Sequence, residues 1–217
     1  MDIGCRSLDG LTHGLLEGSI TQIYGEYATG KTAYCLQAAS KVIADGRRVV
    51  YVDTENGFSP ERAIQIGGEK ILGDIRVYSP DDFSQQVSTI VGIEQSLPKD
   101  IGLVVVDSLV SLYRVEASGS DRRAELIGEL SLQLLLLSRI ARKRRIPVIV
   151  TNQVYDDFEG PGVLPLGGHT VRYWSKVMVL FTRGSSSRRY ARLIRHPFVA
   201  EGGECRFLLA DKGLASE

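Results

Sequence analysis

Eight consecutive residues have the types and spacing of a phosphate-binding loop (P-loop). They fit the pattern G-x-x-x-x-G-K-[ST] and consist of Gly25, Glu26, Tyr27, Ala28, Thr29, Gly30, Lys31 and Thr32. Glycines let backbone N–H groups turn inward around phosphates, and a following helix presents its positive end to them. Lys31 is expected to reach the β- and γ-phosphates, and the Thr32 hydroxyl to bind Mg²⁺. The same pattern also occurs in ordinary glycine turns between a strand and a helix. The assignment as a phosphate-binding loop therefore requires a strand before the pattern and a helix after it.

Three further polar residues follow predicted strands. Asp107 ends an apolar run and is expected to support Mg²⁺ through water. Glu55 comes just beyond a second strand and is a candidate for activating water, while Gln153 follows a third and could sense a γ-phosphate through its amide. Each residue alone would be unremarkable at a strand end. In a parallel sheet, however, these ends meet at one edge, which predicts a site for ATP and Mg²⁺.

The elements that must position these residues are those of an α/β fold. Short β-rich runs alternate with helical stretches, which is typical of a mainly parallel sheet flanked by helices. We expect strands over 20–24, 49–52, 75–78, 103–106 and 147–151, and helices over 31–45, 81–96, 124–145 and from Pro60 onward. The chain should close with antiparallel strands over 176–182, 190–194 and 205–210, with a hairpin turn at 184–187. No regular structure is expected over 160–168, which is rich in Gly and Pro.

The composition excludes several classes of protein. A length of 217 residues with 43% hydrophobic and 24% charged residues predicts a single domain over 1–217 rather than a disordered chain. No apolar run approaches the roughly 18 residues of a membrane span, and the first residues lack a signal peptide. The cysteines Cys5, Cys35 and Cys205 are widely spaced and fit reduced thiols. We therefore expect a cytoplasmic protein with no membrane partner.

The charges balance overall, at 26 Lys+Arg against 26 Asp+Glu, but they are unevenly distributed. Residues 121–195 hold 14 basic and 6 acidic residues, which is typical of a polyanion-binding face. The basic run near 139–145 is equally consistent with a solvated helix end. No pattern for reading bases is evident, so DNA binding should be independent of sequence. The candidate DNA-binding residues are Arg114, Arg122, Arg123, Arg139, Arg142, Lys143, Arg144 and Arg145, supplemented by Arg188, Arg189 and Arg192.

Taken together, the motifs closely resemble the RecA-type recombinase family, especially its archaeal and eukaryotic branch. The matching segments occur in the family's order and cover nearly the whole ATPase core: 25–32, 51–55, 58–62, 103–108, 151–154 and 166–168. The resemblance implies a RecA-type P-loop ATPase core. Because 24 residues precede Gly25, the family's N-terminal helical DNA-binding domain is not expected. The chain is similar in size to core-only archaeal paralogs of the recombinases.

The resemblance also implies roles for individual residues. Glu55 would be the catalytic carboxylate that activates water, assisted by Lys31, and Arg62 would stack on adenine. Gln153 would link the γ-phosphate to the loop that follows it. Two loops would approach DNA, at about 114–123 and about 154–170.

Two features depart from the family pattern. The second presumed DNA loop carries Asp156, Asp157 and Glu159, which would repel phosphates. Where related recombinases cap ATP with an Asp before Ser-Pro, this chain has Arg195-His196-Pro197. These departures imply weak hydrolysis and argue against a filament-type ATP interface.

The sequence thus predicts a Mg-dependent, weakly hydrolysing ATPase that binds DNA, most simply single-stranded DNA. It would assist a full-length recombinase in homologous recombination and DNA repair, and a homodimer is left open. The alternative is a RecA-fold regulatory ATPase that acts on protein partners without DNA, which the acidic loop favours. A small-molecule P-loop kinase fits less well, because no Arg-rich lid or acceptor-binding insertion is evident.

Overall fold

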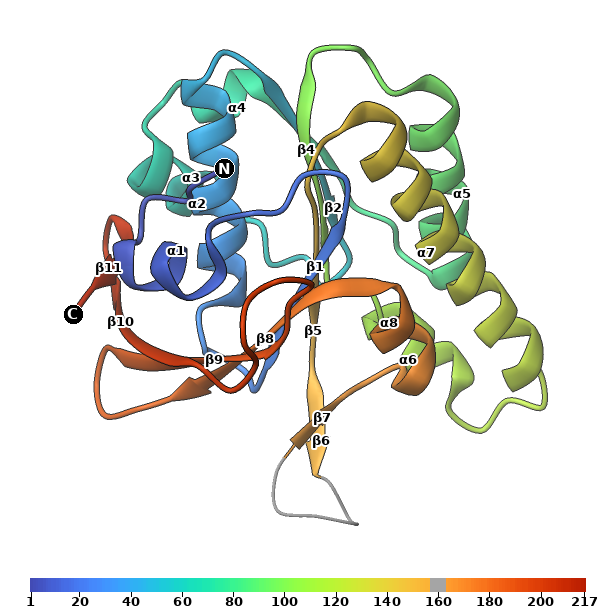
Figure 1. The fold of residues 1–217 in the computed structure, drawn as a ribbon. Coiled ribbons are helices and arrows are strands. Elements are labelled where there is room, and N and C mark those ends of the chain that lie inside the picture. The colour runs from blue at the N-terminus through green and yellow to red at the C-terminus, as the bar shows by residue number, and fades with distance from the viewer. Residues whose placement is uncertain (157–162) are drawn as a thin grey trace.

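The computed structural model describes residues 1–156 and 163–217 and shows a nine-stranded sheet between two layers of helices (Figure 1). The strands of this sheet are β1 (Ile20–Gly25), β2 (Arg48–Asp53), β3 (Ile75–Tyr78), β4 (Ile101–Asp107), β5 (Val148–Asn152), β8 (Ser175–Arg183), β9 (Arg188–Arg195), β10 (Glu204–Ala210) and β11 (Gly213–Ser216). A separate two-stranded sheet pairs β6 (Val154–Asp156) with β7 (Val163–Pro165). The helices are α1 (Arg6–Thr12), α2 (Lys31–Ala44), α3 (Pro60–Gly67), α4 (Ile71–Asp74), α5 (Phe83–Ser96), α6 (Ser111–Ala117), α7 (Arg123–Arg144) and α8 (Gly168–Trp174).

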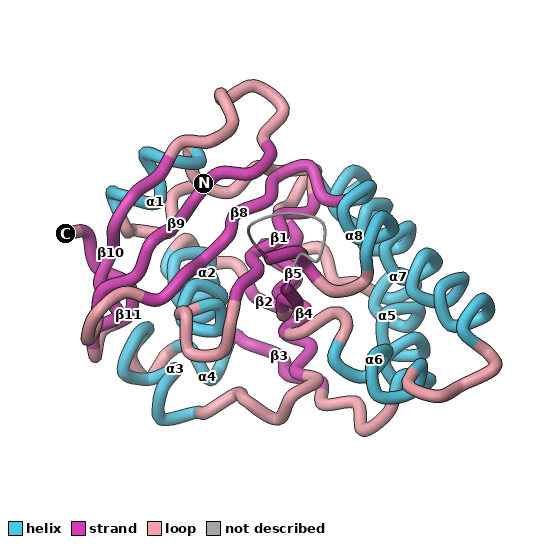
Figure 2. Tube along the Cα trace, turned by 90° about the horizontal axis from the view of Figure 1, so that it is seen from below, coloured by secondary structure: helices cyan, strands magenta, loops and turns pink. Residues whose placement is uncertain are grey.

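The strand order of the large sheet is β11-β10-β9-β8-β1-β5-β4-β2-β3. The six strands from β8 to β3 run parallel, whereas β8, β9, β10 and β11 pair antiparallel. Viewed from the edge at which the parallel strands end, the antiparallel strands extend to one side and α5 to α8 lie on the other (Figure 2). The predicted α/β architecture with C-terminal antiparallel strands is confirmed.

The two faces of the sheet bury two separate cores. Along β4, Leu103 and Val105 pack in the core that includes α2, while Val104 and Val106 pack in the core that includes α5 and α7. A strand covered on both faces has no solvent-facing positions, which is why its sequence is a continuous apolar run. The core therefore fixes β4 rigidly and with it the position of Asp107 at its end.

The longest helix, α7, is held between the sheet and the neighbouring helices (Figure 1). Leu134 and Leu137 are fully buried, whereas Leu132 on another face is 41% exposed. The helix ends where Arg145 adopts a left-handed conformation and donates its backbone N–H to the Ala141 carbonyl. Among the described residues, no helix, α7 included, is long and apolar enough to cross a bilayer.

The expectation of an irregular segment over 160–168 is wrong in part. Residues 157–162 lie outside the described residues, but β7 begins at Val163 and α8 begins at Gly168. Gly167 and Gly168 have φ values of 82° and 56°, so the glycines that discouraged a helix prediction form the turn that starts one. The short elements α1, α6 and β11 were not expected, because a few residues carry too little periodicity.

Packing of α7 generates a stability prediction. Leu137→Ala should lower the free energy of unfolding by about 2–5 kcal/mol, because it removes apolar burial and leaves a cavity against the sheet. Leu132→Ala on the same helix is the matched control and should have a much smaller effect. Urea unfolding followed by circular dichroism measures both. Equal losses in the two variants would contradict the described packing of α7.

Candidate nucleotide site

The P-loop lies between the end of β1 and the start of α2, as the motif requires. Its backbone takes left-handed conformations at Ala28, with φ of 59°, and at Gly30, with φ of 100°. A Cβ on Gly25 would lie 2.1 Å from the Phe181 carbonyl oxygen of β8, so only glycine fits there. The Thr29 hydroxyl donates to the Glu26 carbonyl over 2.9 Å and closes the turn. The loop is therefore shaped by its own sequence and by contact with β8.

Lys31 points into the concave side of this loop. Its Nζ donates to the carbonyl oxygens of Gly25 at 2.9 Å and Glu26 at 2.8 Å. Burial lowers the pKa of Lys31, and the carboxylates of Asp107 and Glu55 partly counteract that shift. A cation held in this position beside the first turn of a helix is suited to an anionic phosphate.

Asp107 is a buried carboxylate at the end of β4. The Tyr51 hydroxyl donates to its Oδ2 over 2.7 Å, and the hydroxyls of Thr151 and Thr32 also donate to it. Burial raises the pKa of Asp107, which these hydrogen bonds counteract. Thr32 and Asp107 thus present neighbouring oxygen atoms of the kind that Mg²⁺ prefers.

Glu55 and Gln153 meet as the sequence predicted. The Gln153 amide donates from Nε2 to Glu55 Oε1 over 2.9 Å, and the Ser111 hydroxyl donates to the same oxygen. Ser111 is the first residue of α6 and was missed, because a serine beyond a strand has no distinctive spacing. The Asp53 carboxylate shapes the loop that contains Glu55 by accepting backbone N–H bonds from Gly57 and Phe58 at 3.1 and 2.9 Å.

Further hydrogen bonds hold the strand ends together. The Thr54 hydroxyl donates to the Ser108 carbonyl over 2.6 Å and accepts from the Ser108 backbone N–H over 2.9 Å. The peptide bond between Asp107 and Ser108 is cis. At the end of β5, Asn152 Nδ2 donates to the Leu166 carbonyl over 2.5 Å, and the Leu166 N–H donates to the Gln153 carbonyl over 3.0 Å. The segments after β2, β4 and β5 therefore form one connected network.

A cavity of about 450 Å³ opens beside the P-loop. Its lining includes the P-loop from Tyr27 to Thr32, together with Glu55, Arg62, Asp107 and Leu209. A second hollow of about 270 Å³ shares Lys31 and Glu55 with the first and extends to Gln153 and Val154. Lys31 and Glu55 thus stand at the junction of the two spaces. The donor set fits a magnesium-bound nucleotide, because a cation, backbone amides, a hydroxyl and buried oxygen ligands converge there.

Arg62 lines this cavity but is engaged with the chain itself. Its guanidinium donates to the carbonyl oxygens of Ala210 at 2.8 Å and Asp211 at 2.7 Å, and to Gln65 Oε1 at 2.9 Å. The arginine expected to stack on adenine therefore holds the turn between β10 and β11 beside the cavity. Its stacking role stays a prediction.

Arg189, grouped with the DNA-binding residues in the sequence analysis, is buried rather than exposed. Its Nε donates to the Ala28 carbonyl of the P-loop over 3.0 Å. Its Nη1 donates to the carbonyls of Ser186 and Arg188 at 2.8 and 2.7 Å. The alternation along β9 turns this side chain inward, opposite to its exposed neighbours. Arg189 is thus a positioning residue for the P-loop. The only sign of its burial in the sequence is the alternation of buried and exposed residues expected along a strand.

The remaining candidate DNA residues do not form one patch. Arg114, Arg122 and Arg123 lie at the end of α6 and the start of α7, whereas Arg139, Arg142, Lys143, Arg144 and Arg145 lie at the far end of α7. With 22 residues, α7 is about 33 Å long. Two of these cations are paired, Arg122 with Glu125 at 2.9 Å and Lys143 with Glu94 at 3.0 Å. On β9, the candidates Arg188 and Arg192 are also paired, with Glu217 at 2.6 Å and Glu204 at 3.7 Å. Of the acidic residues in the second loop, Asp157 and Glu159 lie outside the described residues.

The segment that departs from the family's ATP cap packs against its own chain. His196 is buried, and its Nδ1 accepts the backbone N–H of Val199 over 3.1 Å. Burial lowers the pKa of His196, which favours the neutral ring that this contact requires. Arg195 donates to the Arg172 carbonyl of α8. Both side chains thus make contacts within the chain.

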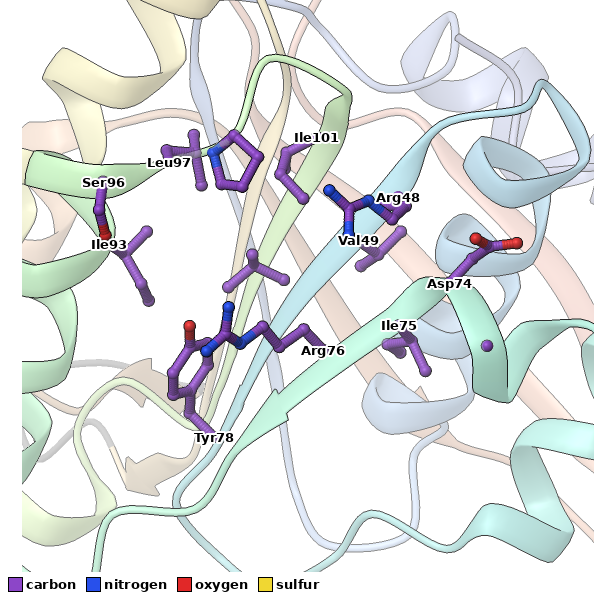
Figure 3. A pocket seen from close by; sticks show the side chains of 13 residues that line it. Arg48, Val49, Asp74, Ile75, Arg76, Tyr78, Ile93, Ser96, Leu97 and Ile101 are labelled. Carbon is purple, nitrogen blue, oxygen red and sulfur yellow. The ribbon is translucent and has the colours of Figure 1, made fainter.

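A further hollow of about 80 Å³ lies at the opposite edge of the sheet (Figure 3). It is formed where β2, β3 and β4 begin, beside the end of α5, and is lined by Val49, Ile75, Ile93 and Ile101 with Arg76 and Tyr78 at its rim. None of the sequence-predicted site residues lines it. Of the hollows described, only the two beside the P-loop are lined by residues that the sequence predicts to bind nucleotide.

The comparisons with known proteins agree with this geometry. A family model described as Rad51 matches residues 1–217. A protein named DNA repair and recombination protein RadB from Methanococcoides burtonii is 36% identical over 214 residues, which cover 97% of this chain and 95% of the relative. Its namesake from Pyrococcus furiosus is 39% identical over 218 residues, covering 97% and 93%. A solved structure described as the crystal structure of the RadB recombinase matches with a TM-score of 0.86 and 36% identity, covering 100% of this chain and 99% of the other.

The contacts of Arg189 generate a prediction. Arg189→Met keeps most of the side-chain length but loses the hydrogen bond to Ala28, so Mg·ATP should bind roughly tenfold more weakly. Arg189→Lys should recover part of that affinity. Arg188→Met, at an exposed neighbour, is the control and should bind like the wild type. Nucleotide titration at a temperature where circular dichroism shows all variants folded measures the effect. Unchanged affinity in Arg189→Met would contradict the positioning role.

Proposed function

The chain belongs to the Rad51 family, and we propose that it binds Mg·ATP and DNA and acts in homologous recombination and DNA repair beside a full-length recombinase. The names of the relatives from Methanococcoides burtonii and Pyrococcus furiosus, which match nearly the whole chain, support the recombination and repair role. The P-loop and the residues around it support the nucleotide-dependent part of the proposal.

The observation that carries the proposal is the hydrogen bond from Gln153 to Glu55 beside Lys31. It joins the proposed base to the residue that begins the segment after β5. A P-loop alone would support phosphate binding; this pair adds a means of activating water and a connection to the next segment. These are the features expected of an ATPase whose nucleotide affects a distant surface.

Each residue has a distinct part in the proposed chemistry. Backbone amides of the P-loop and Lys31 would bind the phosphates, while Thr32 and Asp107 would hold Mg²⁺, Asp107 through water. Bound Mg²⁺ would neutralise charge on the phosphate oxygens. Glu55 accepts a proton from the attacking water, and Ser111 and Gln153 orient its carboxylate through Oε1. We expect slow turnover, because this chain lacks the family's acidic ATP cap and carries Arg195-His196-Pro197 in its place.

Coupling to DNA would pass through Gln153. Its side chain contacts Glu55, while its backbone carbonyl accepts the Leu166 N–H at the other end of the β6–β7 unit. A γ-phosphate that moves Glu55 or Gln153 would therefore alter the base of the loop expected to approach DNA. The expected DNA is single-stranded and bound without sequence preference.

The alternative is a regulatory ATPase that acts on protein partners without DNA. The acidic residues of the second loop favour it, as do the ion pairs that occupy Arg122 and Lys143. The two functions differ in one direct property, which is affinity for nucleic acid at low salt.

Substitutions at the site test the nucleotide roles. Lys31→Ala should weaken Mg·ATP binding at least about tenfold, because it removes the cation that faces the phosphates. Glu55→Gln should preserve binding but lower turnover by roughly 10²–10⁴-fold, because an amide cannot accept the proton. Glu69→Gln, at an exposed carboxylate outside both hollows beside the P-loop, is the control and should behave like the wild type. Fluorescent-nucleotide titration and phosphate release measure the two effects. Equal turnover in Glu55→Gln and wild type would show that the base is assigned wrongly.

DNA binding is tested by fluorescence anisotropy with labelled oligodeoxythymidylate across a salt series. The proposal predicts binding that weakens with salt, with a logarithmic slope of about 0.7 for each phosphate neutralised. It further predicts that Mg·ATP changes the affinity. Absence of binding at low salt would favour the alternative that acts on protein partners.

A further inference from the structure

A hollow at the amino edge of the sheet has the chemistry of a nucleic-acid contact. It has a volume of about 280 Å³ and lies where β1 and β8 begin, beside the last turns of α7. Its polar and aromatic lining consists of Ser19, Ser138, Arg142, Tyr173, Trp174 and Lys176. None of these residues belongs to the P-loop site, which lies at the opposite edge of the sheet.

Two acid-free stretches of sequence form most of this hollow. Residues 130–155 contain five Lys and Arg and no Asp or Glu, and residues 163–200 contain seven and again none. The helices α7 and α8 that belong to these stretches pack against each other. Within residues 1–156 and 163–217, neither Arg142 nor Lys176 forms a salt bridge. Glu17 is adjacent in sequence to Gly18 but does not line the hollow. The space therefore favours an anion.

Aromatic rings stand beside these cations. Tyr173 is 66% exposed, although it is a large aromatic side chain. His169 stacks on it with ring centroids 6.2 Å apart, and Trp174 contacts it edge-on at 5.6 Å. These two rings hold Tyr173 in place, while most of its side chain stays exposed. A fixed, exposed ring next to two cations can stack a base whose phosphate the cations bind.

We propose that this hollow, the α7–α8 pocket, binds a backbone phosphate and an adjoining base of single-stranded DNA. Arg142 and Lys176 bind the phosphate, and Tyr173 stacks on the base. The inference rests on the proposed DNA-binding function and assigns part of it to a place outside the two loops. Because α8 directly follows β7 and its loop, a strand that approaches this loop can continue along α8 to the pocket.

A strand of DNA fits these features better than an acidic peptide does. Carboxylates of a peptide would need the cations but would leave Tyr173 without a flat partner. A base supplies that partner, and stacking tolerates any base, in keeping with binding that is independent of sequence. The serine hydroxyls of the lining offer no pattern of groups that would select one base.

The test compares DNA binding by the full chain and its variants, using labelled oligodeoxythymidylate. Arg142→Gln combined with Lys176→Gln should reduce the salt slope by about 0.7, corresponding to the one phosphate that both cations contact. Tyr173→Ala should weaken binding roughly tenfold with little change in that slope. The matched control is Lys70→Gln combined with Lys99→Gln, two exposed cations that lie outside the pocket and outside the candidate DNA-binding residues, and it should bind DNA like the wild type. Retention of Mg·ATP binding verifies that each variant is folded.

The outcomes separate this inference from the function on which it rests. If the wild type binds no DNA, the proposed function fails. If it binds DNA and the pocket variants match the wild type in affinity and in salt slope, the pocket is overturned. Loss of polyglutamate binding in the pocket variants with unchanged DNA binding would identify an acidic peptide as the occupant and also overturn the proposal. Lys176→Arg, which keeps the charge, should bind DNA like the wild type.

Discussion

The buried carboxylate of Asp107 is the group around which the nucleotide site is assembled. Burying a carboxylate is costly unless hydrogen bonds satisfy it, and burial raises the pKa of Asp107 accordingly. Its partners come from three different elements, with Tyr51 on β2, Thr151 on β5 and Thr32 on α2. Satisfying this one group therefore aligns β2 and β5, the two strands that flank β4, with the helix that carries Lys31. The same alignment brings Glu55 and Gln153 together, because they follow those two strands.

The antiparallel strands support the site from the other side. Arg189 on β9 holds the P-loop at Ala28, and Arg62 on α3 holds the turn that begins at Ala210. On α2, Gln37 exchanges hydrogen bonds with the backbone of Leu214 in β11, at 3.1 Å to the carbonyl and 2.6 Å from the N–H. The P-loop and α2 thus contact both parts of the sheet. The parallel strands carry the proposed catalytic residues at their ends, and the antiparallel strands hold the P-loop and α2 through Arg189 and Gln37. This division explains why the chain continues beyond β8 although the proposed catalytic residues precede it.

Most of the fold and the centre of the site could be predicted, for identifiable physical reasons. Strands covered on both faces leave continuous apolar runs, and polar residues that interrupt them at the carboxyl edge, such as Asp107, stand out. What failed has equally specific causes. Arg189 was grouped with surface cations because charge counts ignore which face of a strand a residue occupies. Ser111 has no distinctive spacing, because serines are common at the starts of helices. The start of α8 was missed because a glycine pair is common in loops. The α7–α8 pocket joins residues far apart in sequence, so Tyr173 had no visible connection to Arg142.

We propose that amides, a cation and oxygen ligands at one edge of the sheet together bind the terminal phosphate of a nucleotide. Isothermal titration calorimetry of the unmodified chain with ATP tests it most directly, once in the presence of Mg²⁺ and once with a chelator. Saturable uptake of one nucleotide per chain is expected, with clearly lower affinity when Mg²⁺ is removed. Folded protein that takes up no Mg·ATP would contradict it.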